Sequence, residues 1–248
     1  MENTIWGIHP VIEAIETAKK IEKIFIKKDS RTSEALEKIR DKVRGTSIIV
    51  QDVPAEKLDR LTKRGNHQGV VALMQEIDYL EFSDLLERIA STETPPLIVA
   101  MDSVTDVRNF GAIARSAECA GADAVIMSAK NSAPVNGEAI RSSAGALNVI
   151  PVCRVGSLRN ALKSLQTSGV QLVAATEKSN KILFECDFTR PTVIIMGSED
   201  KGIAGDILKM CDEQIAIPLL GKIESLNVSA AASVMLYEAL RQRFMAME

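Results

Sequence analysis

Histidine and cysteine are scarce in this chain, and their spacing argues against a metal site. The 248 residues include two histidines, His9 and His67, and four cysteines. The cysteines lie more than twenty residues apart, form no Cys-x-x-Cys pair and have no histidine nearby. A structural zinc site needs several such ligands at short spacings. We therefore expect no metal, and isolated thiols in a reducing compartment.

Long hydrophobic runs are also missing. The longest runs, such as residues 97–101, are far shorter than the roughly 20 apolar residues of a membrane-spanning helix. The opening MENTIWGIHP has no basic region followed by an apolar run, which a secretory signal would require. The sequence predicts a cytoplasmic protein without a membrane segment.

An excess of positive charge is missing as well. The net charge is −3, and residues 1–78 hold 14 Lys+Arg against 13 Asp+Glu. A protein that binds nucleic-acid phosphates concentrates positive charge on one part of its surface. Because the net charge here is negative, any such basic patch must be local. The residues that could form one are Lys57, Arg60, Lys63 and Arg64 with Lys27 and Lys28. A solvated helix face explains the same cluster, and charge alone does not separate the two readings.

Helix and strand patterns alternate in the first part of the chain. Amphipathic helices are predicted over 9–18, 33–42 and 54–61, and strands over 21–26, 46–50 and 69–74. This predicts a compact α/β domain over 1–78. Residues 79–96 are expected to be a linker in which Ser83 caps a short helix over 84–90 and STETPP breaks regular structure.

Short apolar strands recur between helices from residue 97 onward, and they predict a second α/β domain over 97–248. The predicted strands cover 97–101, 124–127, 171–175, 193–196 and 214–217. Strands alternating with helices indicate a mainly parallel sheet covered on both faces. Ligands bind such sheets beyond the carboxyl ends of the strands, where the unusual residues of this chain cluster.

The first unusual stretch is NFGAIARSAECAG, residues 109–121. Its small and apolar residues fall on one face of a helix, and Arg115 lies off that face. We expect Asn109 and Gly111 in the loop before the helix, where an amide and a close backbone approach could meet a ligand. A capped helix carrying a solvated arginine is the alternative.

The second stretch is VIIMGSEDKGI, residues 193–203. A buried strand leads into Gly197 and Glu199, and Gly202 permits another tight turn. No Lys-Ser/Thr pair follows the second glycine, which excludes a P-loop, and GxGxxG is absent after a strand. Glu199 could orient a substrate or cap the next helix.

The third stretch is IPLLGKIESLNVS, residues 217–229, which leads into a helix. Ser225 and Asn227 are expected to cap that helix, and a polar loop between buried elements could enclose a small ligand. An apolar stripe from Val228 to Leu240 fits either an internal core or a dimer interface.

Together the three stretches resemble the SpoU branch of the SPOUT methyltransferases, the TrmH-like RNA ribose methyltransferases. The resemblance covers most of residues 97–245 and includes IRSSAGALNVIP at 140–151. Residues 5–15 (IWGIHPVIEAI) and 65–72 (GNHQGVVA) resemble the L30e-like RNA-binding domain attached to many members. This layout is closest to the bacterial enzymes that methylate a guanosine ribose in 23S rRNA.

The resemblance implies a knotted fold, a cofactor and a partner. Family members have a deep trefoil knot at the C-terminal end of the sheet, bind S-adenosylmethionine in it, act on RNA and form homodimers. By matching motifs, the cofactor would contact Thr176, Gly197, Ile217, Leu219, Leu226 and Ser229. The resemblance assigns catalytic roles to Asn109, Arg115, Glu199, Asn227 and Ser229. Because a guanidinium stays protonated in proteins, we expect Arg115 to bind the target phosphate and stabilise a developing alkoxide.

Three other functions fit parts of this pattern. The first is a tRNA ribose methyltransferase, or an rRNA enzyme that protects an antibiotic producer; the N-terminal Lys/Arg cluster favours rRNA, whose folded surface it could contact. The second is an RNA-binding protein that has lost catalysis, against which the joint presence of Asn109, Arg115, Glu199 and Asn227 argues. The third is a structural or small-molecule α/β protein, which only the acidic net charge favours.

Overall fold

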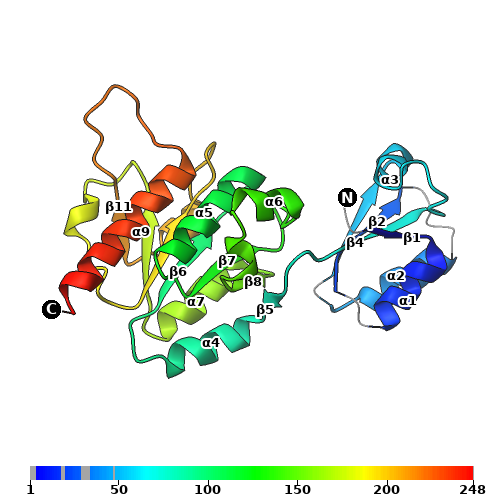
Figure 1. Ribbon diagram of the computed structural model, residues 1–248, viewed down its shortest axis with the longest axis horizontal. Helices are drawn as coiled ribbons and strands as arrows, with labels where there is room; N and C mark the ends of the chain where they lie inside the picture. Colours follow the sequence, from blue (N-terminus) through cyan, green and yellow to red (C-terminus); the bar gives the residue numbers. More distant parts are fainter. Residues whose placement is uncertain (1–3, 18–19, 29–33, 47, 248) are drawn as a thin grey trace. The chain divides into compact units, whose positions relative to one another are not determined.

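The computed structural model describes residues 4–17, 20–28, 34–46 and 48–247 of the chain. Ala18, Ser33 and Ser47, which belong to predicted elements, lie outside the described residues. The chain divides into two compact units, Met1–Glu76 and Ile77–Glu248. Both are drawn in Figure 1.

The first unit is a four-stranded sheet with three helices. Its strands are β1 (Thr4–Trp6), β2 (Ile21–Lys27), β3 (Ile49–Val53) and β4 (Val70–Met74), in the order β1-β4-β2-β3. Its helices are α1 (Ile8–Glu16), α2 (Glu34–Val43) and α3 (Ala55–Leu61). Strands β2 and β3 are parallel, and β4 runs antiparallel to both β1 and β2.

The alternation of side chains along β2 explains how this unit packs. Ile24 and Ile26 join the core beneath α1 and α2, whereas Phe25 joins a smaller core with Leu58 of α3 and Val71. Successive residues of a strand point to opposite faces, so one strand serves both cores. The face that carries α3 is therefore distinct from the face that carries α1 and α2.

The second unit has a seven-stranded sheet in which every strand pair is parallel. Its strands are β5 (Tyr79–Leu80), β6 (Leu97–Met101), β7 (Ala124–Ser128), β8 (Val152–Val155), β9 (Gln171–Ala175), β10 (Thr192–Met196) and β11 (Glu213–Ile215). They are ordered β11-β9-β10-β6-β7-β8-β5. The predicted parallel sheet is confirmed, although the sequence patterns missed the short strands β5 and β8.

Helices cover both faces of this sheet (Figure 1). They are α4 (Phe82–Ser91), α5 (Val107–Cys119), α6 (Gly137–Ser142), α7 (Leu158–Thr167), α8 (Gly205–Leu208) and α9 (Val228–Met245), with short 3₁₀ helices η1 (Ala146–Asn148) and η2 (Leu183–Glu185). One core lies beneath α5 and α9, and the other beneath α4 and α7. In β6, Val99 faces the first core and Ile98 the second, which is why this strand is apolar throughout.

The interval 79–96, expected to be a linker, belongs to the second unit. β5 pairs with β8, and α4 buries Leu85 in the core beneath it. The apolar spacing of Leu85, Leu86 and Ile89 gives α4 one buried face. The segment therefore packs into the second unit and is not an extended linker. Ser83 lies inside α4 and the N-cap position is occupied by Glu81, so the predicted Ser83 cap is wrong.

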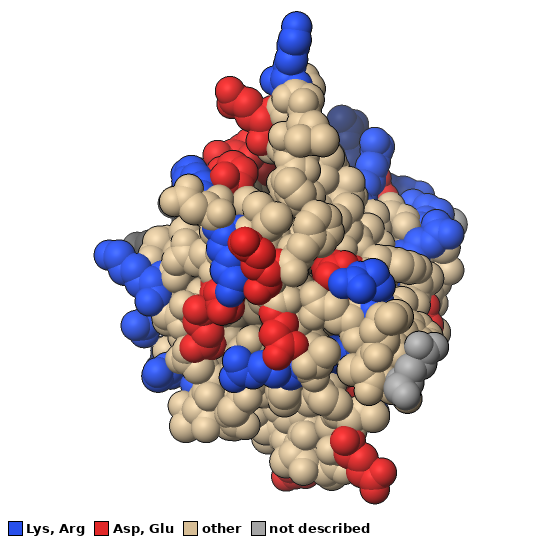
Figure 2. Space-filling view, turned by 90° about the vertical axis from the view of Figure 1, so that its left-hand side faces the viewer, with Lys and Arg blue, Asp and Glu red and all other residues tan. Residues whose placement is uncertain are grey.

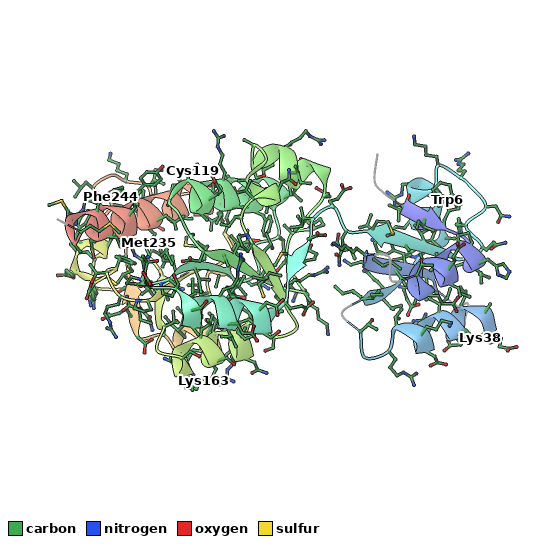
Figure 3. All side chains as sticks on the ribbon, turned by 60° about the horizontal axis from the view of Figure 1, so that its bottom comes forward. Trp6, Lys38, Cys119, Lys163, Met235 and Phe244 are labelled. Carbon is green, nitrogen blue, oxygen red and sulfur yellow. The ribbon has the colours of Figure 1, made fainter. Side chains whose placement is uncertain are left out.

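Helix α9 is apolar on more than one side. Its predicted stripe, which includes Met235 and Ala239, lies in the core beside α5 and is therefore internal. Phe244 and Tyr237 are instead exposed, and Figure 3 labels Met235 and Phe244 at their two positions. Among the described residues, no helix is long and apolar enough to cross a membrane.

Candidate active site

Side chains from all three predicted stretches meet in one hydrogen-bond network. The Oε1 atom of Glu199 accepts from Nδ2 of Asn109 at 2.9 Å and from Nδ2 of Asn227 at 2.6 Å. Asn227 Nδ2 also donates to Oδ1 of Asn109 at 3.1 Å. Three residues separated by up to 118 positions in sequence thus form a closed triangle, which we call the Asn-Glu-Asn triangle.

The N-cap of α9 orients Asn227 within the triangle. Its Oδ1 atom accepts from the Ser229 backbone N–H at 3.0 Å and from Ser229 Oγ at 2.6 Å. This leaves the amide nitrogen to donate to Glu199 and Asn109. The predicted Asn227 cap is confirmed, and Ser225 lies in the loop before the helix rather than at its N-cap.

Asn109 lies inside α5, not in the loop before it. Asp106 is the N-cap of that helix, and the backbone N–H groups of Asn109 and Arg108 hold the pKa of Asp106 below its ordinary value. Gly111 is also helical: a Cβ there would lie 2.7 Å from the carbonyl oxygen of Ala139. The glycine therefore permits close packing of α5 on α6, and the expected close approach to a ligand at Gly111 is wrong.

A tight turn presents Glu199. A Cβ on Gly197 would lie 2.2 Å from the carbonyl carbon of Gly202, so glycine is required where the two strands of the turn meet. Ser198 and Gly202 exchange backbone hydrogen bonds of 3.1 and 2.9 Å. Helix α8, which follows, has Ala204 at its N-cap without a side-chain cap, so Glu199 does not serve as one.

A pocket of about 440 Å³ opens beside the triangle, and Glu199 and Asn227 form part of its wall. This volume lies within the ordinary range for small-molecule sites. Five of the predicted cofactor residues line it: Thr176, Gly197, Ile217, Leu219 and Leu226. Ser229, the sixth, lies outside the lining and contacts the pocket wall through Asn227.

The pocket combines an apolar interior with a charged rim. Apolar side chains of Met196, Ile215 and Ile217 lie where strands β10 and β11 end. Sequence reasoning missed the charged residues that line the pocket besides Glu199: Glu177, Lys178, Asp200, Lys201 and Glu224. With Glu199 they give four carboxylates and two ammonium groups, a formal charge of −2. The sequence could have indicated these residues, because they lie directly after predicted strands or just before the last helix.

Arg115 is placed apart from the triangle. It is exposed on α5 and does not line the pocket. It follows Asn109 by six residues, which is about 9 Å along a helix axis. The next residue, Ser116, has its Oγ 2.7 Å from Oγ of Ser233, and this pair joins α5 to α9. The sequence pattern predicted only that the small residues of this stretch, which include Ser116, pack on one face of the helix.

Potential metal ligands do not gather at this site. Among the described residues, no group of three or more His, Cys, Asp and Glu side chains could hold a metal ion. Burial raises the pKa of Cys153 and Cys211 to about 12, and that of Cys186 to about 11. These buried thiols stay protonated, as expected of structural cysteines.

Residues 96–237 match the SpoU rRNA Methylase family, and residues 4–80 match the RNA 2′-O ribose methyltransferase substrate-binding family. The chain therefore belongs to the SpoU rRNA methylase family. It is 33% identical over 239 residues to an uncharacterized tRNA/rRNA methyltransferase of Synechocystis sp., covering 96% of this chain and 62% of that relative. An uncharacterized tRNA/rRNA methyltransferase of Mycolicibacterium smegmatis is 36% identical over 243 residues, covering 96% of this chain and 76% of its own length.

A solved structure resembles the whole chain. The SpoU methyltransferase AviRb from Streptomyces viridochromogenes, in complex with the cofactor AdoMet, is 29% identical with a TM-score of 0.61. The likeness covers 98% of this chain and 91% of AviRb.

Proposed function

We propose that this protein transfers a methyl group from S-adenosylmethionine to the ribose 2′-oxygen of an RNA nucleotide. The observation that carries the proposal is the Asn-Glu-Asn triangle, in which three family motifs meet at the wall of one pocket. Family membership supports the reaction class. The match of residues 4–80 to a substrate-binding family supports RNA as the substrate.

The chemistry of the pocket suits S-adenosylmethionine. At neutral pH this molecule carries a sulfonium, an ammonium and a carboxylate, so its net charge of +1 complements the −2 rim. Ile215, Ile217 and Leu219 offer adenine an apolar slot with backbone groups at the strand ends. When bound, the cofactor supplies an electrophilic methyl group. We further propose that the surrounding chain, residues 197–227, takes part in the trefoil knot of the family.

The residues of the site would position the ribose and stabilise charge on its oxygen. A 2′-hydroxyl is barely ionised at neutral pH, so negative charge develops on it during transfer. The exposed Arg115 guanidinium can bind a neighbouring phosphate and stabilise that charge. The triangle holds the start of α5, the 198–202 turn and the start of α9 together, which contributes by orientation. Ser229 supports Asn227 in this role.

For the substrate, we propose a guanosine of 23S rRNA, with tRNA as the alternative. The first unit, which we propose to be L30e-like, favours a folded rRNA surface. The names of the two relatives, tRNA/rRNA methyltransferases, keep both substrates open. We also propose a cytoplasmic location, which suits an enzyme acting on rRNA or tRNA.

We also propose that the chain forms a homodimer. Large apolar side chains that are exposed close together mark interaction surfaces. Val234, Tyr237 and Phe244 of α9 are exposed, as are Leu220 and Ile223 in the loop before it. Figure 2 shows acidic and basic side chains interspersed with uncharged surface over one face of the molecule, without a large field of one sign. A face without a large field of one sign has little electrostatic repulsion against a second copy.

The test is incubation with S-adenosylmethionine and, separately, unmodified 23S rRNA, 16S rRNA and bulk tRNA, followed by digestion and mass spectrometry. We expect 2′-O-methylguanosine with 23S rRNA. Product with tRNA alone would replace the substrate and keep the reaction. An absence of product with every RNA, together with an absence of cofactor binding, would refute the proposed reaction.

A further inference from the structure

The turn that follows α3 in the first unit holds two cations in an unfavourable backbone conformation. Lys63 and Arg64 have φ angles of 52° and 64°, a region that side chains with a Cβ rarely adopt. Glycine is the usual residue just after a helix for this reason. Hydrogen bonds fix the turn: the Arg64 N–H donates to the Asp59 carbonyl at 2.7 Å, and the Gly65 N–H to the Thr62 carbonyl at 3.0 Å. Strain that the surroundings maintain points to a function.

An exposed indole lies against the same turn. Trp6, the single tryptophan of the chain, ends β1 and is 41% exposed. Figure 3 labels its position. A Cβ on Gly65 would lie 3.2 Å from Trp6 Nε1, so the edge of the indole rests on the turn backbone. Gln68 Oε1 accepts from the Ile8 N–H at 3.0 Å, which ties the end of the turn to the start of α1. The indole and the two cations are therefore held in fixed relation.

The cations of this unit differ in how they are neutralised. On α2, Lys38 pairs with Glu34 at 2.9 Å, and Lys42 pairs with Glu16 at 2.7 Å. Arg60, Lys63 and Arg64 form no ion pair with any described residue.

The α3 side of this unit carries more cations than carboxylates. Glu56 and Asp59 lie around the same surface hollow as Arg60, Lys63 and Arg64, and the Asp59 carboxylate lies 3.3 Å from Nε2 of His67. The Lys57 ammonium lies 4.4 Å from the centre of the Phe25 ring. The four cations and two carboxylates of residues 56–64 thus leave a net charge of +2 on the α3 side of the sheet, next to Trp6.

We propose that Trp6, Arg60, Lys63 and Arg64, which we call the Trp6 surface, bind the substrate RNA. An unpaired base would stack on the exposed indole, and the three cations would contact the flanking phosphates. Aromatic faces combined with cations are the usual means of holding single-stranded or looped RNA. The proposal rests on the proposed function, because it assigns RNA contacts to the unit that accompanies the active site.

The first test separates folding from binding by relieving the strain. In the double variant Lys63→Gly/Arg64→Gly, glycine suits the positive φ, so the melting temperature should stay the same or rise. RNA affinity should fall, and the slope of log K against log salt should flatten by about 1.4 for two lost phosphate contacts on single-stranded RNA. The matched control, Lys38→Ala/Lys42→Ala, removes the same charge from α2 and should bind almost as the unchanged protein does.

The second test removes the stacking surface. Trp6→Ala should weaken RNA binding roughly 10-fold, the usual scale for one base–aromatic stack, and Trp6→Phe should retain most of the affinity. Cofactor affinity should not change. The glycine variant keeps the proposal testable if Trp6→Ala destabilises the first unit.

Filter binding of unmodified 23S rRNA and bulk tRNA, across about 50 to 200 mM KCl, measures these effects. The expected result is weaker binding by the Lys63/Arg64 and Trp6→Ala variants and unchanged binding by the control. If all variants bind and methylate RNA as the unchanged protein does, the Trp6 surface is wrong and the proposed function stands. If the unchanged protein binds RNA without methylating it while the variants bind more weakly, the proposed function fails and the surface stands. If the unchanged protein binds neither RNA, the Trp6 surface is wrong, and the methylation test with all three RNAs decides the proposed function separately.

Discussion

Replacing Asn227 by aspartate separates its two roles. The carboxylate of Asn227→Asp can still accept from the Ser229 and Ala230 N–H groups, so the cap of α9 persists. It can no longer donate to Glu199 or Asn109. It also places a second negative charge where the amide nitrogen now lies 2.6 Å from Glu199.

The expected loss of stability follows from these contacts. Two lost hydrogen bonds cost about 1 kcal/mol each. Two like charges roughly 3 Å apart in a water-like dielectric add about 1.4 kcal/mol, since both side chains are exposed. The new negative charge at the start of α9 interacts favourably with the helix dipole, which offsets about 0.5 kcal/mol of this loss. We expect Asn227→Asp to lower the free energy of unfolding of the second unit by about 3 kcal/mol.

A second substitution should restore much of this loss. In Glu199→Gln/Asn227→Asp, the amide of residue 199 can donate to the new carboxylate, which removes the repulsion and reverses the polarity of the bond. The double variant should be about 2 kcal/mol more stable than the sum of the single changes predicts. Urea unfolding followed by circular dichroism measures this coupling, while fluorescence of Trp6 reports on the first unit. A coupling below about 0.5 kcal/mol would mean that the triangle does not hold these loops together.

Four further predictions concern other parts of the second unit. Arg115→Ala should reduce turnover in single-turnover methylation at least roughly 100-fold. Its cofactor affinity, measured by calorimetry, should not change. Near-full turnover by this variant would show that Arg115 does not stabilise the developing charge. Arg243 donates four hydrogen bonds to main-chain carbonyls. Arg243→Ala should therefore lower the free energy of unfolding, measured by urea titration, by about 3 kcal/mol. A loss under about 1 kcal/mol would contradict the structural role of these bonds. At pH 8 a thiol reagent should react rapidly with the exposed Cys119 alone, and Cys119→Ser should abolish the fast phase. Burial raises the pKa of Cys153 and Cys211 to about 12, whereas thiols in the unfolded chain ionise near about 8.5. The free energy of unfolding should therefore decline from about pH 8.5 toward about pH 12. A constant free energy of unfolding across this range would contradict the burial of these two thiols.

The strands of the second unit were predictable because parallel strands buried on both faces are apolar throughout. The apolar runs at residues 97–101 and 192–196 predict β6 and β10 in this way. Strand β8 is only Val152–Val155, and β5 is two residues long, so their patterns are too short to distinguish from loops. Helix α4 was predicted, but not its packing, because the partners that bury Leu85 lie elsewhere in the chain.

The residues of the site were predictable only through their motifs. Nothing in the local sequence indicates that Asn109 contacts Glu199, since the two lie 90 positions apart and meet only once the sheet has formed. Asp106, three residues before Asn109, was a readable helix N-cap and would have placed Asn109 inside α5. The Ser116–Ser233 pair carried no such signal, because small residues on a packed helix face are ordinary.

We propose that this site methylates a ribose oxygen of RNA. The most direct test is transfer of label from methyl-labelled S-adenosylmethionine to the RNA that the protein modifies, followed by nucleoside analysis, with Arg115→Ala in parallel. Label in a 2′-O-methylnucleoside, lost in the variant, is the predicted result. Label in a methylated base, or equal labelling by Arg115→Ala, would contradict the account.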